Sequence, residues 1–224
     1  SKRVPEKNVR PIGGETLLEI AIKAAMSARG VHETAISTDS EAYLALARAA
    51  GIDEAYIRPA ELSEDHVSSI ATVLHYLDWR DVHNKPHASH IVLLQPTSPF
   101  RRANHIDEAL EKMTANNRQS LVSLTPATPG SRYIVHRRQE PPSGDLKIEE
   151  GGDDIYVLDG SLFITPVDML KSERRFWNEK SAAYINHYPR FFDIDSESDF
   201  MAADALLKHE WCLEGGTPGD HNLN

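Results

Sequence analysis

Short apolar segments and longer amphipathic segments alternate between residues 15 and 124 of this 224-residue chain. In the longer segments apolar side chains recur about every 3.6 residues, which predicts helices over 15–29, 41–50, 68–82 and 104–114. The short segments predict strands over 34–38, 55–57, 91–94 and 120–124. This order predicts an α/β fold with three layers, a Rossmann-like arrangement in which helices cover both faces of a mostly parallel sheet.

The pattern changes after residue 125. Two segments around the turn-forming Pro141-Pro142-Ser143-Gly144 predict an inserted hairpin or flap over about 126–155. Strands are then expected over 161–164 and 182–185, followed by the segment 191–195 and a helix over 197–208. We therefore expect one domain over residues 1–212 and a flexible tail over 213–224.

The charge balance narrows the class of partner. The chain carries 24 Lys and Arg against 34 Asp and Glu, a formal net charge of −10, which argues against a general grip on a nucleic-acid backbone and favours a small-molecule site. There is one cysteine, Cys212, and no apolar run long enough for a membrane span. We expect a cytoplasmic protein without nucleic-acid or membrane partners.

Ligands of such folds bind beyond the carboxyl ends of the strands, so the loops after Thr38, Leu94 and Leu124 are expected to carry the site. The second of these loops, Gln95-Pro96-Thr97-Ser98-Pro99, combines a restricted backbone with donors and acceptors suited to a base or sugar edge. Arg58 and Ser69 flank another strand end and helix start that face the same crevice.

Two charged segments complete the candidate site. Residues 1–8 (Ser-Lys-Arg-Val-Pro-Glu-Lys-Asn) place three cations ahead of a helix, an arrangement that can hold a polyphosphate, although a frayed basic terminus would look the same. In Asp193-Ile194-Asp195, an extended backbone would point both carboxylates to one face. Without a His or Cys set beside them, these oxygens suit Mg²⁺ better than zinc, and a solvated strand end is the alternative.

Taken together, these segments resemble the acylneuraminate cytidylyltransferases, also called CMP-sialic acid synthetases. The resemblance rests on five segments in the same order, at residues 1–8, 37–39, 58–69, 93–101 and 193–200. It implies a nucleotidyltransferase that transfers CMP from CTP to the anomeric hydroxyl of a nonulosonic (sialic-type) acid and releases pyrophosphate. It also implies a homodimer and Mg²⁺ as cofactor.

The resemblance assigns roles to individual residues. The residues expected to bind the nucleotide are Ser1, Lys2, Lys7, Asn8, Arg58 and Ser69. The residues expected to bind the sugar acid are Gln95, Ser98 and Arg132. The metal is expected to bind Asp193 and Asp195, which together with Lys7 form the expected catalytic group.

One segment departs from the family pattern: the usual Asn-Gly-Ala-Ile-Tyr is Asp159-Gly160-Ser161-Leu162-Phe163 here. Two other functions therefore stay open from sequence alone, a metal-dependent glycosyltransferase that uses the Asp-x-Asp pair and a non-catalytic nucleotide-binding relative.

Overall fold

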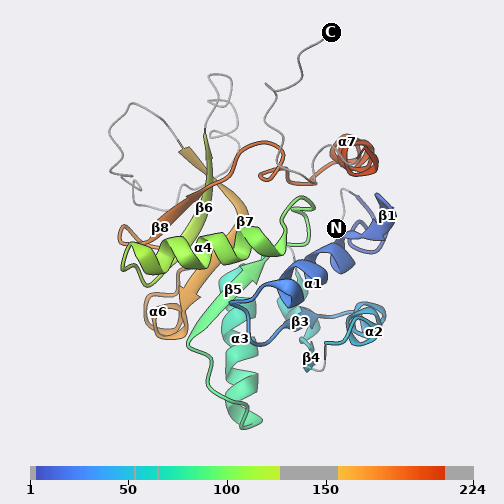
Figure 1. Ribbon diagram of the computed structural model, residues 1–224. Helices are drawn as coiled ribbons and strands as arrows, with labels where there is room; N and C mark the ends of the chain where they lie inside the picture. Colours follow the sequence, from blue (N-terminus) through green and yellow to red (C-terminus); the bar gives the residue numbers. More distant parts are fainter. Residues whose placement is uncertain (1–3, 53, 65, 127–155, 210–224) are drawn as a thin grey trace.

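The computed structural model of the chain describes residues 4–52, 54–64, 66–126 and 156–209 (Figure 1). Its helices are α1 (Leu17–Ser27), α2 (Glu41–Ala49), η1 (Ala60–Ser63), α3 (Ser69–Val82), α4 (Ala103–Ala115), α6 (Val167–Glu173) and α7 (Glu197–Lys208). Its strands are β1 (Pro11–Ile12), β2 (Glu15–Thr16), β3 (Ala35–Thr38), β4 (Glu54–Ile57), β5 (His90–Leu94), β6 (Leu121–Pro126), β7 (Tyr156–Pro166) and β8 (Ala182–Ile185). Most of the expected insert, the expected tail, Ser1, Lys2 and Arg132 lie outside the described residues.

The main sheet has the strand order β5-β7-β6-β8. Strand β6 runs parallel to β8, and β7 is antiparallel to both of its neighbours, so β5, β6 and β8 share one direction. Strands β3 and β4 form a separate parallel pair. The strand directions are therefore mostly parallel, as expected, with β7 as the antiparallel exception in the main sheet.

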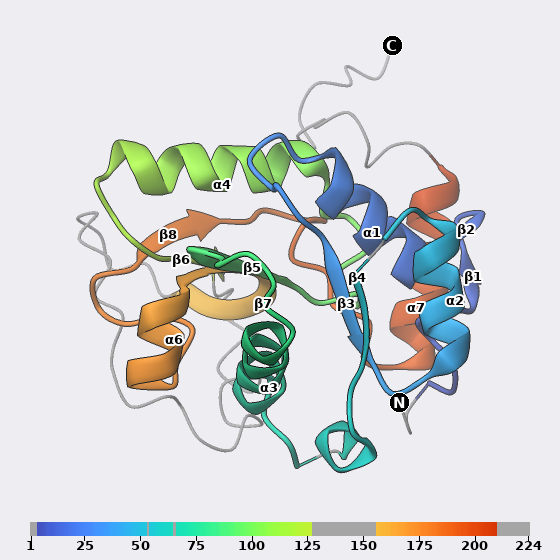
Figure 2. The ribbon, with the colours of Figure 1, turned by 90° about the horizontal axis from the view of Figure 1, so that it is seen from below.

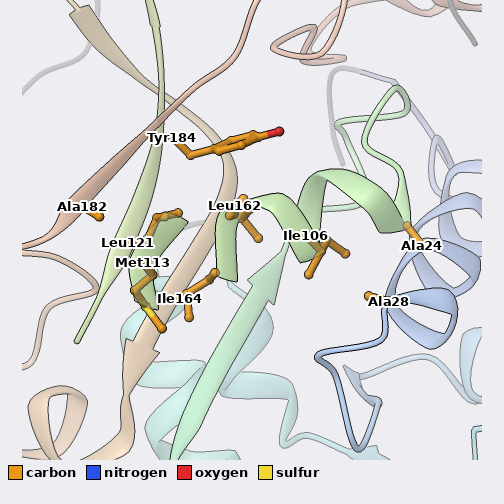
Figure 3. Packing of buried hydrophobic residues seen from close by; sticks show 10 residues of the cluster. Ala24, Ala28, Ile106, Met113, Leu121, Leu162, Ile164, Ala182 and Tyr184 are labelled. Atoms are coloured by element: carbon orange, nitrogen blue, oxygen red, sulfur yellow. The ribbon is translucent and has the colours of Figure 1, made fainter. Parts of the chain in front are cut away.

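Helices cover both faces of the main sheet (Figure 2). On one face, α1 and α4 pack against inward residues of the strands in a cluster that includes Ile106, Leu121, Leu162 and Ile164 (Figure 3). Alternate residues of β7 serve the two faces: Leu162 and Ile164 face α4, whereas Phe163 packs with α3 and α6. This period of two is what a strand buried on both sides requires, and the result is the expected three-layer α/β fold.

A further cluster joins the two ends of the described chain. Val4, Ile12, Leu17 and Ile20 pack against residues of the α7 region, including Ile194, Phe200 and Ala203. Helix α7 begins with a capping box, in which Ser196 and Asp199 satisfy each other's backbone N–H groups. This cluster fixes the segment just before α7 beside the start of the described chain.

The structure also differs from the sequence-based expectations. Helix α6 was not expected, and residues 191–195 form an irregular segment without strand hydrogen bonding. Residues 11–16 form a small hairpin, β1–β2, which the Gly- and Pro-rich composition did not suggest. Among the described residues, no helix combines the length and the apolar character needed to cross a membrane.

Candidate active site

Lys7 lies directly against the acidic segment near the other end of the chain. Its Nζ donates a hydrogen bond of 2.6 Å to the carbonyl oxygen of Ile194 and lies 4.0 Å from Oδ1 of Asp195. The Lys7 side chain is only 11 % exposed, whereas that of Asp195 is 63 % exposed. The cation is thus held in place by the protein while the carboxylate beside it faces solvent.

The Asp193-Ile194-Asp195 segment is anchored at its centre. Ile194 is fully buried in the cluster that joins the chain ends, while Asp193 is half-buried and Asp195 exposed. Although the segment is not a regular strand, the two carboxylates flank a buried residue. This arrangement leaves Asp195 accessible to a ligand from solvent.

The loop after β5 lies next to the same segment. The backbone N–H of Ile194 donates to the carbonyl oxygen of Thr97 at 3.0 Å, and Gln95 is half-buried at the start of the loop. Ser98 is buried, with its N–H 3.4 Å from the carbonyl oxygen of Gln95. Ile194 therefore bonds to Lys7 on one side and to the loop on the other, and the structure brings together three segments that the sequence singled out.

Arg58 and its neighbours form a second group, at the carboxyl ends of β3 and β4. The Arg58 backbone N–H donates to Thr38, its Nε donates to Oγ of Ser63 at 2.7 Å, and its NH2 lies 3.6 Å from Oδ1 of Asp39. Because β3 and β4 are parallel, their ends meet at the same edge. Ser69 is the exposed first residue of α3.

Tyr43 responds to charges next to both Lys7 and Arg58. Burial raises the pKa of Tyr43, in the first turn of α2, and the negative charges of Glu6 and Asp39 raise it further. Glu6 precedes Lys7 and Asp39 pairs with Arg58, so both groups act on the same phenol. Tyr43 is therefore near a residue adjacent to Lys7 and near the ion-pair partner of Arg58.

Asn8 adds a polar group that the protein leaves unsatisfied. Within the described residues, its Oδ1 is buried and has no hydrogen-bond partner. Buried polar atoms are nearly always paired, so an orphan oxygen next to Lys7 fits a position where a ligand supplies the missing donor.

Two residues near Gln95 were missed as functional candidates. Arg101 is buried and holds the carbonyl oxygen of Gln95, and Asp159 lies in a buried polar network on β7. Arg101 ends one of the quoted motifs, and Asp159 marks the departure from the family pattern. Neither signal identified the partners that lie far away in the sequence, such as Ser161 for Arg101 and Asn186 for Asp159.

The donor set suits a hard divalent cation only in part. The described residues contain no group of three or more His, Cys, Asp or Glu side chains that could hold a metal ion by themselves. A pair of aspartates offers oxygen ligands, and Mg²⁺ is commonly bound by one or two carboxylates together with water and substrate phosphates. The pair fits Mg²⁺ that arrives with a nucleotide better than a permanently bound ion.

The chain is similar to several known proteins. A family profile described as "Cytidylyltransferase" matches residues 1–140. The chain is 29 % identical over 214 residues to a CMP-N,N'-diacetyllegionaminic acid synthase of Legionella pneumophila, covering 93 % of this chain and 92 % of that protein. It is 32 % identical over 210 residues to an N-acylneuraminate cytidylyltransferase of Escherichia coli, covering 91 % of this chain but 48 % of that protein.

The fold has solved counterparts. A CMP:2-keto-3-deoxy-manno-octonic acid synthetase complexed with CTP superimposes with a TM-score of 0.65 at 17 % identity, covering 94 % of this chain and 95 % of that one. At this identity the likeness concerns the fold alone. The family profile, however, spans more than half of the chain. The chain therefore belongs to the cytidylyltransferase family and is a nucleotidyltransferase enzyme.

Proposed function

We propose that this cytidylyltransferase transfers CMP from CTP to the anomeric hydroxyl of a nonulosonic acid and releases pyrophosphate. One observation carries the proposal: Ile194 bonds through its carbonyl to Lys7 and through its N–H to the loop that begins at Gln95. A phosphate-binding cation, an acidic pair and a polar loop suited to a sugar acid thereby meet around one buried residue.

The proposed reaction is an in-line displacement at the α-phosphorus of CTP. The anomeric oxygen of the sugar acid attacks the α-phosphorus of CTP in line, the bond from that phosphorus to the β-phosphate oxygen breaks, and the hydroxyl proton passes to solvent. Negative charge grows on the phosphate oxygens during this exchange. An ammonium has three donors, of which Lys7 commits one to Ile194, so others can stabilise the developing charge.

Asp193 and Asp195 would hold Mg²⁺ with the phosphates of CTP. When bound, the ion neutralises negative charge on the triphosphate. The exposure of Asp195 supports this role, because the carboxylate can be reached from solvent by an ion that arrives with the nucleotide.

The choice of a nonulosonic acid rests on the relatives. The named relatives are an N-acylneuraminate cytidylyltransferase and a synthase for a CMP-activated legionaminic acid. Gln95 and Ser98 are the described residues that we assign to the sugar acid, and the resemblance adds Arg132. We also propose a homodimer, which light scattering on the purified protein tests directly.

A panel assay tests the activity. The full chain is mixed with CTP, Mg²⁺ and, in separate reactions, N-acetylneuraminic, legionaminic, pseudaminic and deaminated neuraminic acids, and pyrophosphate release is followed. We expect release with at least one sugar and none without Mg²⁺. Absence of release with every sugar contradicts the proposal.

The metal assignment has its own test. Asp195→Asn removes one charged ligand, so we expect the Mg²⁺ concentration for half-maximal rate to rise at least about tenfold. Asp168→Asn is the control, because Asp168 is an exposed aspartate in the first turn of α6. An equal Mg²⁺ requirement in both variants contradicts the assignment.

A further inference from the structure

We propose that Arg101 is a positioning residue that fixes Gln95 for the sugar acid, and that Asp159 holds Arg101 in turn. The proposal rests on the proposed function, in which Gln95 binds that substrate. It adds two buried residues behind the binding loop.

Arg101 grips the backbone of Gln95 from inside the protein. It is 3 % exposed, and its NH1 and NH2 each donate to the carbonyl oxygen of Gln95 at 3.2 Å. Its NH1 also donates to the carbonyl oxygen of Ser161 on β7. The planar guanidinium fork thus ties the start of the loop to the sheet.

Stability alone does not explain a charge at this place. Within the described residues, Arg101 forms no ion pair, and its Nε has no hydrogen-bond partner. Burial lowers the pKa of Arg101 to about 10, while the charge of Asp159 acts in the opposite direction. Because an incompletely compensated buried charge costs stability, a well-packed apolar residue would serve the core at least as well.

Asp159 is held rigidly by neutral donors. Its Oδ1 accepts hydrogen bonds from Oγ of Ser123 and from the backbone N–H of Ser161, and its Oδ2 accepts one of 2.8 Å from Nδ2 of Asn186. Ser161 is the residue whose carbonyl binds Arg101. The carboxylate therefore fixes the backbone acceptor of Arg101, and its negative charge offsets part of the cost of burying the guanidinium.

Gly160, between Asp159 and Ser161, brings β7 against the side chain of Gln95. The pairing of β6 with β7 shifts register between Val122 and Leu124, and Gly160 has a φ of +75°. A Cβ at this position would lie 3.6 Å from Oε1 of Gln95. Gln95 is thus held at its backbone by Arg101, and its amide oxygen lies on the side of Gly160 where a larger residue would place its Cβ.

A loosened loop would also affect the acidic segment, because Thr97 accepts the hydrogen bond from Ile194. A small pocket beside Arg101, lined also by His105, Asn186 and Arg190, has room for only about one water molecule. It is too small for a sugar acid. Arg101 therefore acts on the substrate through Gln95 rather than by contact.

Kinetics of Arg101→Lys test the proposal, with CTP, Mg²⁺ and the sugar acid of the panel that gives the fastest pyrophosphate release with the wild-type protein. Lysine keeps the charge, but its ammonium cannot replace the three hydrogen bonds that the planar guanidinium donates to the carbonyl oxygens of Gln95 and Ser161. We expect the KM for the sugar to rise about tenfold, the size of effect of a lost hydrogen bond, with the KM for CTP changed less than about twofold. Asp159→Asn should also raise the KM for the sugar, by a smaller factor.

Arg80→Lys is the matched control. Arg80 is a buried arginine at 5 % exposure whose partners are Glu33 and Glu54, in a part of the fold to which we assign no substrate. The Arg80→Lys substitution should lower thermal stability without changing the ratio of the KM for the sugar to the KM for CTP. Equal changes of both constants in Arg101→Lys, or the same pattern in Arg80→Lys, would overturn the proposal.

Hydrogen–deuterium exchange gives a readout that does not depend on turnover. In Arg101→Lys we expect faster exchange in the loop after β5 and at the N–H of Ile194, with exchange in α3 unchanged. In Arg80→Lys we expect faster exchange in α3, with exchange in the loop and at Ile194 unchanged. If the wild-type protein releases no pyrophosphate, the proposed function fails, yet exchange still decides whether Arg101 orders the loop. Unchanged exchange in that loop contradicts the positioning role.

Discussion

At the scale of single residues, Lys7 has the most informative surroundings. It is largely buried, bonded to a backbone carbonyl and close to a carboxylate. A lysine used only for solubility would extend into solvent, where its entropy cost is lowest. A fixed ammonium fits the catalytic role that we propose for Lys7, because electrostatic catalysis uses charges that are already held in place.

Lys7→Met removes this charge, so we expect kcat/KM for CTP to fall by about 100-fold or more. Lys171→Met is the control, because Lys171 forms a surface ion pair with Asp81. Steady-state pyrophosphate release measures both variants, and circular dichroism checks that they fold. Comparable activity of the two variants would remove Lys7 from the catalytic group.

Residue chemistry also sets what the sequence can predict. Lys7, Gln95 and Asp195 are candidates from the sequence because each carries a functional group that suits a nucleotide, a sugar or a metal. Arg101 and Asp159 were not assigned a role, because their function depends on partners such as Ser161 and Asn186. Only the fold brings those partners within hydrogen-bond distance.

At the scale of elements, the start of α4 is sensitive to pH. His105 completes the N-terminal cap of α4 by accepting a hydrogen bond of 3.1 Å at Nδ1 from the backbone N–H of Arg102. Burial, together with the charge of Arg190, lowers the pKa of His105 to about 4. The folded protein therefore keeps this ring neutral at a pH where the unfolded chain protonates it.

Stability must fall as the pH drops from about 6.5 toward 4, because the unfolded state binds a proton that the folded state refuses. Between pH 7 and about 4.5 we expect the wild type to lose about 2–3 kcal/mol more than His105→Gln. Glutamine can accept the same capping bond without titrating. Urea unfolding at both pH values measures the difference; parallel losses would show that His105 is not responsible.

The elements themselves were predicted unevenly. Amphipathic helices such as α4 and α7 were found within one residue at either end, since their apolar period is a local property. The direction of β7 was not, because alternation of side chains is the same in parallel and antiparallel strands. Helix α6 follows β7 without a break, so no polar linker marked it.

At the scale of the whole molecule, the β1–β2 hairpin touches the helix nearest the other end of the described chain. The backbone N–H of Gly13 donates to Oδ1 of Asp204 at 2.9 Å, and a Cβ on Gly13 would lie 2.6 Å from Cβ of Leu207. Gly14 also has a positive φ, but a Cβ there meets nothing within 4 Å. Comparing substitutions at these two neighbouring glycines therefore separates the cost of backbone strain from the cost of a steric clash with α7.

We expect Gly13→Ala to lower the free energy of unfolding by about 1–3 kcal/mol more than Gly14→Ala, which bears only the strain of a positive φ. Denaturant unfolding of both variants supplies the comparison. Equal destabilisation would mean that α7 moves away from the hairpin without cost.

The bond from Lys7 to Ile194 spans 187 positions of the chain. During synthesis, strands β3 to β7 and their helices leave the ribosome before the residue that must receive this lysine. A growing polypeptide can therefore build most of its layers while it still cannot arrange the groups that meet at Ile194. The site that we propose is therefore completed late in translation, when the segment before α7 docks and closes the long loop of chain between the two partners.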